Sequence, residues 1–366
     1  SYGYNRALLS WYTINSDLQR KTAYSPSHLS DEDREGPYVR EISINEIFPD
    51  KDIPHGQPLR LRTFDLAFYP EERGPYNFDV EGIPGTSSGI NSNGQLIDPE
   101  SRWGGVFRQI QTNDFESANI EFLEFWMMDP FLENPISAGG DFYINLGNVS
   151  EDILKDSRKS YENGLPIDGS EENIDTTAWG RVPSVQALVT AFNSGADARA
   201  LQDVGIDGMD DEMERDFIAS EGGETISYLD RIQNEYGPTS NAYLNANDDP
   251  AADNYHFFYG DDYDAQQKGI LERYKKYNGP EGNSPTGDEA ISSYTQLPDI
   301  EDINNDFTLS ETESYFQYNI SMRPQDLDQV GENYITSIIE NAGPNSDTRW
   351  IQFKVPVRSF DKKIGS

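Results

Sequence analysis

Short segments in which apolar and polar residues alternate are the feature that most constrains the fold of this chain. Apolar side chains stand at every second position in three segments, 141–147, 315–322 and 350–357. The segment 59–69 shows the same alternation, with one slip of phase in its middle. Such alternation is typical of strands with one buried face, and a slip indicates a bulge or two strand pieces. Residues 118–128 are apolar at most positions, which predicts a strand covered on both faces.

The intervening segments predict one more strand and several short helices. Residues 70–102 are rich in glycine and proline, which predicts a long loop, and residues 105–111 resume a strand pattern after it. Helices are expected over 150–163, 183–195, 210–219 and 224–236, because a capping residue, a proline or a downstream glycine marks most of their ends. Helices in the middle of the chain therefore separate two groups of strands.

This order predicts a mainly β fold with α insertions, built from jelly-roll-like β-sandwich modules and a helical, irregular acidic insertion. We expect a connecting segment over 1–57, a β-sandwich domain over 58–166, a helical, loop-rich acidic insertion over 167–300, and the strands of a second, incomplete β-sandwich over 301–366. The strands before residue 150 are expected to share one sandwich, and those after residue 310 are expected to form the other.

Charge and composition limit the partners of the chain. Lys and Arg number 28 against 65 Asp and Glu, which gives a formal net charge of −37. A surface of this sign repels nucleic acid and anionic lipid headgroups and suits cations or basic partners. No apolar run approaches the roughly 20 residues of a membrane-spanning helix, so this segment is not expected to span a membrane by itself. Neither end resembles a natural terminus, which predicts a fragment of a larger protein.

The chain lacks the usual signatures of catalysis, and we expect it not to be an enzyme. The absence of cysteine excludes disulfides and thiolate chemistry, and the three histidines lie far apart in the sequence. A hydrolase with a pair of carboxylates stays open, because acidic residues are abundant. A carbohydrate-binding module also stays open, since Trp103, Trp126 and Trp179 could stack on sugar rings, although core packing is the commoner use of a tryptophan.

The sharpest local motif is an acidic, glycine-containing stretch over residues 203–214 that resembles a calcium-binding loop. Counted from its first residue, it has glycine at the sixth position and an acid at the twelfth, but glycine replaces the expected ligand at the third. The candidate ligands of a structural Ca²⁺ are Asp203, Asp207, the carbonyl group of Met209, Asp211 and Glu214. The alternative interpretation is a turn followed by a helix whose first-turn acids are stabilised by the helix dipole alone.

A second acidic segment, residues 247–264, contains Asp253 and a run of aromatic residues. It permits a cation site or an aromatic patch that binds a partner. A solvated loop held in place by buried aromatic side chains is the commoner arrangement for such a sequence.

Several segments spread along the whole chain together resemble one known family. They include NRALLSWY at 5–12, LAFYPEERGPYNFD at 66–79 and NIEFLEFWMMDP at 119–130. Further segments of the same kind lie at 103–108, 145–156, 161–166, 203–208, 306–311 and 360–365. In number and order these segments resemble the SprA (Sov) family of outer-membrane translocons of the type IX secretion and gliding-motility system.

The resemblance implies a role in protein export without catalytic residues. Members of that family form a very large outer-membrane barrel that exports folded cargo proteins. The chain would then be a non-catalytic cap or vestibule segment of such a translocon. Its expected partners are the rest of the barrel, accessory outer-membrane subunits and secreted cargo. It would face the cell exterior, with the periplasm as the alternative.

Overall fold

The chain folds into two compact units, and each unit is assembled from three separate segments. The computed structural model describes residues 2–112, 114–159, 161–162, 165–185, 191–287, 295, 297–298, 301–345 and 347–365. Unit 1 comprises Ser1–Tyr12, Phe64–Arg108 and Glu151–Leu309, whereas unit 2 comprises Thr13–Thr63, Gln109–Ser150 and Ser310–Ser366. The described residues form mainly small antiparallel sheets with few and short helices, which confirms the predicted fold class.

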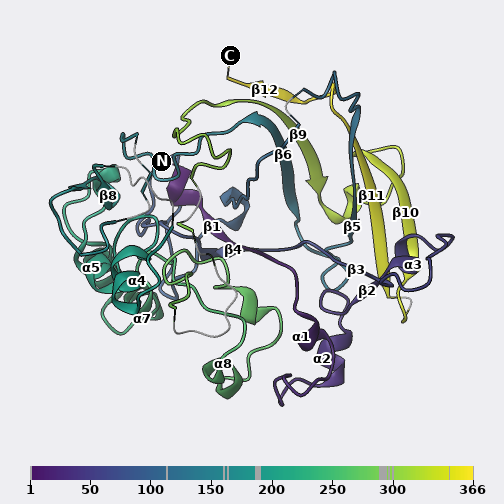
Figure 1. The fold of residues 1–366 in the computed structure, drawn as a ribbon, viewed down its shortest axis with the longest axis horizontal. Helices are drawn as coiled ribbons and strands as arrows, with labels where there is room; N and C mark the ends of the chain where they lie inside the picture. Colours follow the sequence, from purple (N-terminus) through teal and green to yellow (C-terminus); the bar gives the residue numbers. More distant parts are fainter. Residues whose placement is uncertain are drawn as a thin grey trace. The chain divides into compact units, whose positions relative to one another are not determined.

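The described residues of unit 2 include two antiparallel sheets of three strands each (Figure 1). The first has the order β10-β11-β5 and consists of β5 (Phe122–Met128), β10 (Ile335–Ala342) and β11 (Thr348–Pro356). The second has the order β12-β9-β6 and consists of β6 (Gly140–Asn148), β9 (Ser314–Met322) and β12 (Lys362–Ile364). β6, β9 and β11 confirm the alternating patterns in the sequence, and β5 confirms the strand predicted from the apolar run.

The apolar core of unit 2 joins side chains of both sheets. Phe353 on β11 and Ile320 on β9 are fully buried in one cluster. Phe125 on β5 stacks on Phe353 with a centroid separation of 5.1 Å and meets Phe142 of β6 edge-on at 6.3 Å. Because burial of each such side chain contributes about 1.5–3 kcal/mol, these contacts are a main source of stability in unit 2.

The other face of β5 and β11 is covered as well, as the apolar run at 118–128 predicts. Trp350 on β11 is buried in a second cluster, and Trp126 on β5 packs against it. Ile42 and Ile47 complete this cluster. They come from β2 (Ile42–Ser43), which pairs with β3 (Arg60–Leu61), and from α3 (Ile44–Ile47).

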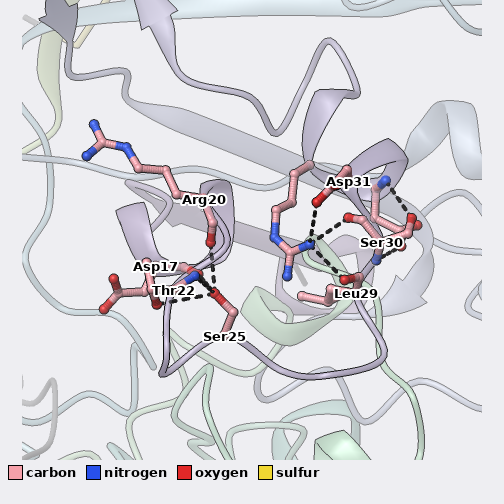
Figure 2. Close-up of polar contacts among 9 residues, drawn as sticks. Asp17, Arg20, Thr22, Ser25, Leu29, Ser30 and Asp31 are labelled. Carbon is pink, nitrogen blue, oxygen red and sulfur yellow. Dashed lines mark hydrogen bonds and ion pairs between the residues drawn. The ribbon is translucent and has the colours of Figure 1, made fainter.

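Local hydrogen bonds fix the irregular segment that precedes β2. The hydroxyl group of Ser25 lies 2.8 Å from the carbonyl oxygens of Asp17 and Arg20 (Figure 2). A capping box joins Ser30 and Asp33, in which each side chain accepts the backbone N–H of the other residue. The two helices ordered in this way are α1 (Ser16–Gln19) and α2 (Asp31–Glu35).

The described residues of unit 1 form two short β pairs and five short α-helices. The strands are β1 (Ala7–Tyr12) paired with β4 (Asp65–Arg73), and β7 (Ile174–Thr176) paired with β8 (Arg181–Pro183). The α-helices are α4 (Ala196–Gln202), α5 (Asp211–Asp216), α6 (Tyr228–Tyr236), α7 (Asn241–Asp248) and α8 (Asp261–Ala265). Single 3₁₀ turns occur at η1 (Tyr2–Asn5), η2 (Pro99–Ser101), η3 (Ser220–Gly222) and η4 (Glu272–Tyr274), and in unit 2 at η5 (Pro324–Asp326).

The core of unit 1 is built around an irregular segment rather than a sheet. Residues 76–96 carry no long strand, yet they supply Phe78 and other buried side chains to the apolar cluster of unit 1. The ring of Phe78 contacts Tyr228 of α6 edge-on at 5.6 Å and lies 6.3 Å from Trp179. The loop predicted between residues 70 and 102 is therefore a structural part of the core.

The pairing of the strands corrects the expected division into two sandwiches. β5 pairs with β11, and β6 pairs with β9, so early and late strands share the same sheets. The slip of phase within 59–69 separates β3 of unit 2 from β4 of unit 1. Residues 105–111 form no strand and expose Val106 and Phe107. Alternation identifies which face of a strand is buried, but it does not identify the partner strand.

The helix predictions are confirmed in part. α5 and α6 lie within the predicted intervals 210–219 and 224–236. The described residues of 150–163 form no helix, because the Asp152 side chain accepts the N–H of Lys155 in a turn, and Lys155 has a positive φ of 50°. Residues 186–190 of the helix predicted at 183–195 lie outside the described residues. Among the described helices, none has the length and apolar character needed to cross a membrane.

Candidate metal centre

Three buried carboxylate side chains of unit 1 converge on one point. Asp207, Glu214 and Asp253 each place one oxygen within 4.8 Å of the corresponding oxygens of the other two. Their exposed fractions are 0%, 2% and 0%. We refer to these three residues as the buried carboxylate cluster. Its members come from the loop before α5, from α5 itself and from the turn after α7.

The loop and the helix start place two members of the cluster. Gly205 and Gly208 have positive φ angles of 74° and 68°, which glycine adopts without strain, and they turn the chain on either side of Asp207. The Asp210 side chain accepts the N–H of Met213 at 2.9 Å and so caps α5. Glu214 consequently lies one turn into α5, on its buried side.

Each member of the cluster has one oxygen oriented by a single hydrogen-bond donor. Asp207 Oδ1 accepts the N–H of Met209 at 3.2 Å, and Glu214 Oε2 accepts the N–H of Ala251 at 2.9 Å. Asp253 Oδ2 accepts a hydrogen bond from the hydroxyl group of Tyr76 at 3.2 Å.

The second oxygen of each carboxylate is buried and has no donor. Asp207 Oδ2, Glu214 Oε1 and Asp253 Oδ1 accept no hydrogen bond from any residue that the structure describes. The same holds for Oε2 of Glu281, whose backbone N–H donates to the carbonyl oxygen of Asp253. Within the described part of the chain, no Lys, Arg or His forms an ion pair with these four carboxylates.

Burial and mutual repulsion disfavour the ionised forms of these groups when no cation is present. Burial, followed by the charge of Asp253, raises the pKa of Asp207 well above its usual range. Burial and then Asp207 raise the pKa of Glu214, and burial and then Asp249 raise that of Asp253. The pKa of Glu281 rises to about 9, chiefly through burial and then through Asp253. The cluster therefore requires protons or a cation to balance its charge.

The structure brings together two of the five ligands that the sequence suggests. Asp207 and Glu214 lie in the cluster. Asp203 lies elsewhere, since its Oδ2 accepts the N–H of Ser284 at 2.7 Å. Asp211 accepts the side-chain N–H of Asn254 at 3.2 Å. Met209 is buried, and its N–H donates to Asp207 and to the carbonyl oxygen of Val204.

Two acidic residues of this region are distant from the loop in sequence. Asp253 belongs to the second acidic segment, and Glu281 lies beyond it in a turn that pairs with residue 254. Burial distinguishes Asp253 from its neighbours, because it is the member of Asp248, Asp249 and Asp253 that is fully buried. Sequence spacing alone gives no signal for this convergence, since it arises from the path of the chain after α7.

A second acidic group lies elsewhere in unit 1. Oxygens of Asp152, Asp156 and Glu162 lie within 4.8 Å of one another. Glu162 is buried beside Glu301, whose Oε2 accepts the backbone N–H of Glu162 at 2.6 Å. Burial and then Glu301 raise the pKa of Glu162, so these two carboxyl groups share an environment that disfavours two charges.

The three candidate tryptophans occupy different environments. Trp179 is buried in the core of unit 1, and Trp126 packs against the second cluster of unit 2. Trp103 is partly exposed, and the guanidinium group of Arg6 lies 5.5 Å from its ring centroid. Burial therefore prevents Trp179 from stacking on a sugar, whereas Trp126 is only partly buried.

Comparison with known families adds a functional context to this geometry. Residues 227–366 match the SprA_N family, which is described as a motility related/secretion protein. This part of the chain is similar to that family. The SprA-like stretch includes α6, α7, Asp253 and Glu281 of unit 1, and β9 to β12 of unit 2. No curated protein matches the chain.

Proposed function

We propose that this chain is a non-catalytic cap or vestibule segment of a bacterial outer-membrane translocon of the type IX secretion system. The observation that carries the proposal is the match of residues 227–366 to a family of motility and secretion proteins. The matched residues contribute to both units, so the similarity extends to helices of unit 1 and to strands of unit 2.

The charge of the chain supports a role in an aqueous vestibule. A net charge of −37 keeps such a segment soluble and repels anionic lipid headgroups. In this proposal the segment faces the cell exterior. It contacts the rest of the barrel, accessory outer-membrane subunits and passing cargo, and it is needed for export of cargo and of surface gliding adhesins.

The test is made in a gliding bacterium that carries the parent gene. The segment is deleted from the chromosomal gene, and export is followed as the amount of an epitope-tagged cargo protein in the culture supernatant, together with colony spreading. We expect both to fall at least tenfold while the parent protein still accumulates in the outer membrane. Normal export by a strain without the segment would contradict the proposal.

If the deletion prevents accumulation of the parent protein, a variant with altered surface residues tests the proposal instead. Leu66 and Phe68 are exposed on β4, and their replacement by serine leaves the cores intact. Ile136, which is 92% exposed in unit 2, provides a control for loss of an exposed apolar side chain. Reduced export in Leu66→Ser/Phe68→Ser, with normal export in Ile136→Ser, would support contact between this surface and the export machinery.

The absence of catalysis is part of the same proposal. The purified chain is expected to give no turnover with glycoside, ester or peptide substrates. Turnover that disappears on replacement of one carboxylate, such as Glu214→Gln, would identify a hydrolase instead.

A further inference from the structure

We propose that Asp207, Glu214 and Asp253, with Glu281 beside them, form a buried site for one Ca²⁺ ion. The site differs from a continuous calcium-binding loop, because its ligands come from segments up to 74 positions apart in the chain, from Asp207 to Glu281. It is independent of the proposed role in secretion, since it rests on the geometry of unit 1 alone.

The first argument is the arrangement of the oxygens. Each carboxylate uses one oxygen for a protein donor and leaves the other buried without a partner. A buried carboxylate with no partner is costly, and proteins normally provide a cation or a donor for it. Three carboxylates that converge on one point, each with such an oxygen, therefore indicate a missing positive charge rather than three separate defects.

The second argument is the spacing. Ca²⁺ binds oxygen ligands at about 2.3–2.6 Å, so two ligands on opposite sides of one ion lie about 5 Å apart. Mutual separations within 4.8 Å fit that limit. Carboxylate oxygens suit hard cations such as Ca²⁺, Mg²⁺ and Mn²⁺, and the described ligand set contains no nitrogen or sulfur.

Backbone packing leaves space for the carboxylates. A Cβ atom built on Gly205 would collide with Asp253 Oδ2, and one built on Gly208 would collide with the carbonyl oxygen of Arg181. Both glycines therefore allow the loop to approach the neighbouring segments closely. A bound ion would join this loop to α5 and to the turn after α7.

The experiment measures Ca²⁺ binding to the whole chain by titration calorimetry after removal of metal with a chelator, with Mg²⁺ and Mn²⁺ tested in parallel. We expect one Ca²⁺ per chain for the wild type. Asp253→Asn and Glu214→Gln should each weaken binding at least tenfold. Glu212→Gln is the matched control, because Glu212 is exposed on the same helix and its replacement removes the same charge; its affinity should equal that of the wild type.

The melting temperature of each protein, measured with Ca²⁺ and with chelator, provides a second test that does not require a variant to bind the ion. In chelator, Asp253→Asn should melt above the wild type, because the variant no longer buries an acidic group that lacks a partner for its charge, whereas in Ca²⁺ it should melt below the wild type. Asp203→Asn separates the two site models, since a continuous loop needs Asp203 and the buried carboxylate cluster does not. Equal responses to Ca²⁺ in wild type and Asp253→Asn, or no binding by the wild type, would overturn the proposal.

Discussion

Glu46 accepts the indole N–H of Trp350 at 2.8 Å and forms a buried ion pair with Arg40 at 2.6 Å. The side chains of the pair are 3% and 8% exposed, so loss of the carboxylate would leave the guanidinium group buried without its partner. We expect Glu46→Gln to lower the free energy of unfolding by about 3 kcal/mol, measured by chemical denaturation. The exposed pair of Glu116 and Arg358 is the control, and Glu116→Gln should cause no measurable change.

The same carboxylate predicts a dependence of stability on pH. Burial acts to raise the pKa of Glu46, but the hydrogen bonds from Arg40 and Trp350 outweigh it and hold the pKa below its usual value. A carboxylate with a lowered pKa in the folded state stabilises the protein above the pKa of the unfolded state, and this stabilisation is lost as the pH falls through the folded value. The difference in stability between wild type and Glu46→Gln should therefore shrink below about pH 4.3. A constant difference from pH 7 to pH 3 would contradict this assignment.

The core of unit 2 gives a prediction about packing. Phe353 is fully buried between two sheets and stacks on Phe125. Phe353→Ala should lower the free energy of unfolding by about 3–5 kcal/mol, because it creates a cavity as well as removing apolar contacts. Ile136→Ala, at a position that is 92% exposed, should change stability by less than about 0.5 kcal/mol in the same denaturation experiment.

Alanine variants at Gly205 and Gly282 distinguish the cost of backbone strain from the cost of crowding the candidate metal centre. Both have φ near 75°, but a Cβ atom on Gly282 meets no atom within 4 Å, whereas one on Gly205 collides with Asp253. Gly282→Ala should therefore cost only the strain of a left-handed residue, about 1–2 kcal/mol. Gly205→Ala should cost more and should also abolish the response of the melting temperature to Ca²⁺. Equal losses in the two variants would show that Asp253 can move aside.

Hydrogen exchange offers a local measure of Ca²⁺ binding. The amides of Met209 and Ala251 donate to carboxylates of the cluster, so their opening should become rarer when an ion is bound. At a free Ca²⁺ concentration 100 times the dissociation constant, the opening free energy should rise by about 2.7 kcal/mol. In Glu214→Gln the exchange rates of these amides should be nearly the same with Ca²⁺ and with chelator.

The sequence predicts the strands of unit 2 better than their partners. Ile320 and Phe353 lie at alternating positions that identify β9 and β11, because one face of each strand is buried. β1 and β10 were not predicted as strands, and pairing between residues such as Phe142 and Ile320 depends on contacts far apart in sequence. Local pattern contains no information about such long-range choices.

The candidate metal centre was predictable only in its local part. Asp207 and Glu214 belong to one acidic loop and helix start, whose glycine and capping residues are visible in the sequence. Asp253 and Glu281 join them only because the chain returns past α7 and pairs residue 254 with 281. That return is held by side chains such as Tyr76, which lies in a segment that sequence alone describes as a loop.

The division of unit 2 into three chain segments affects how the protein can be made. Roughly 165 residues separate the end of β6 at Asn148 from the start of β9 at Ser314, its partner strand. At a synthesis rate of about 5–20 residues per second, β6 waits about 10–30 seconds for its neighbour. During that interval the nascent chain presents an unpaired strand with an apolar face, which favours aggregation. We therefore expect a chaperone that protects β5 and β6 until β9 has emerged to raise the yield of folded protein.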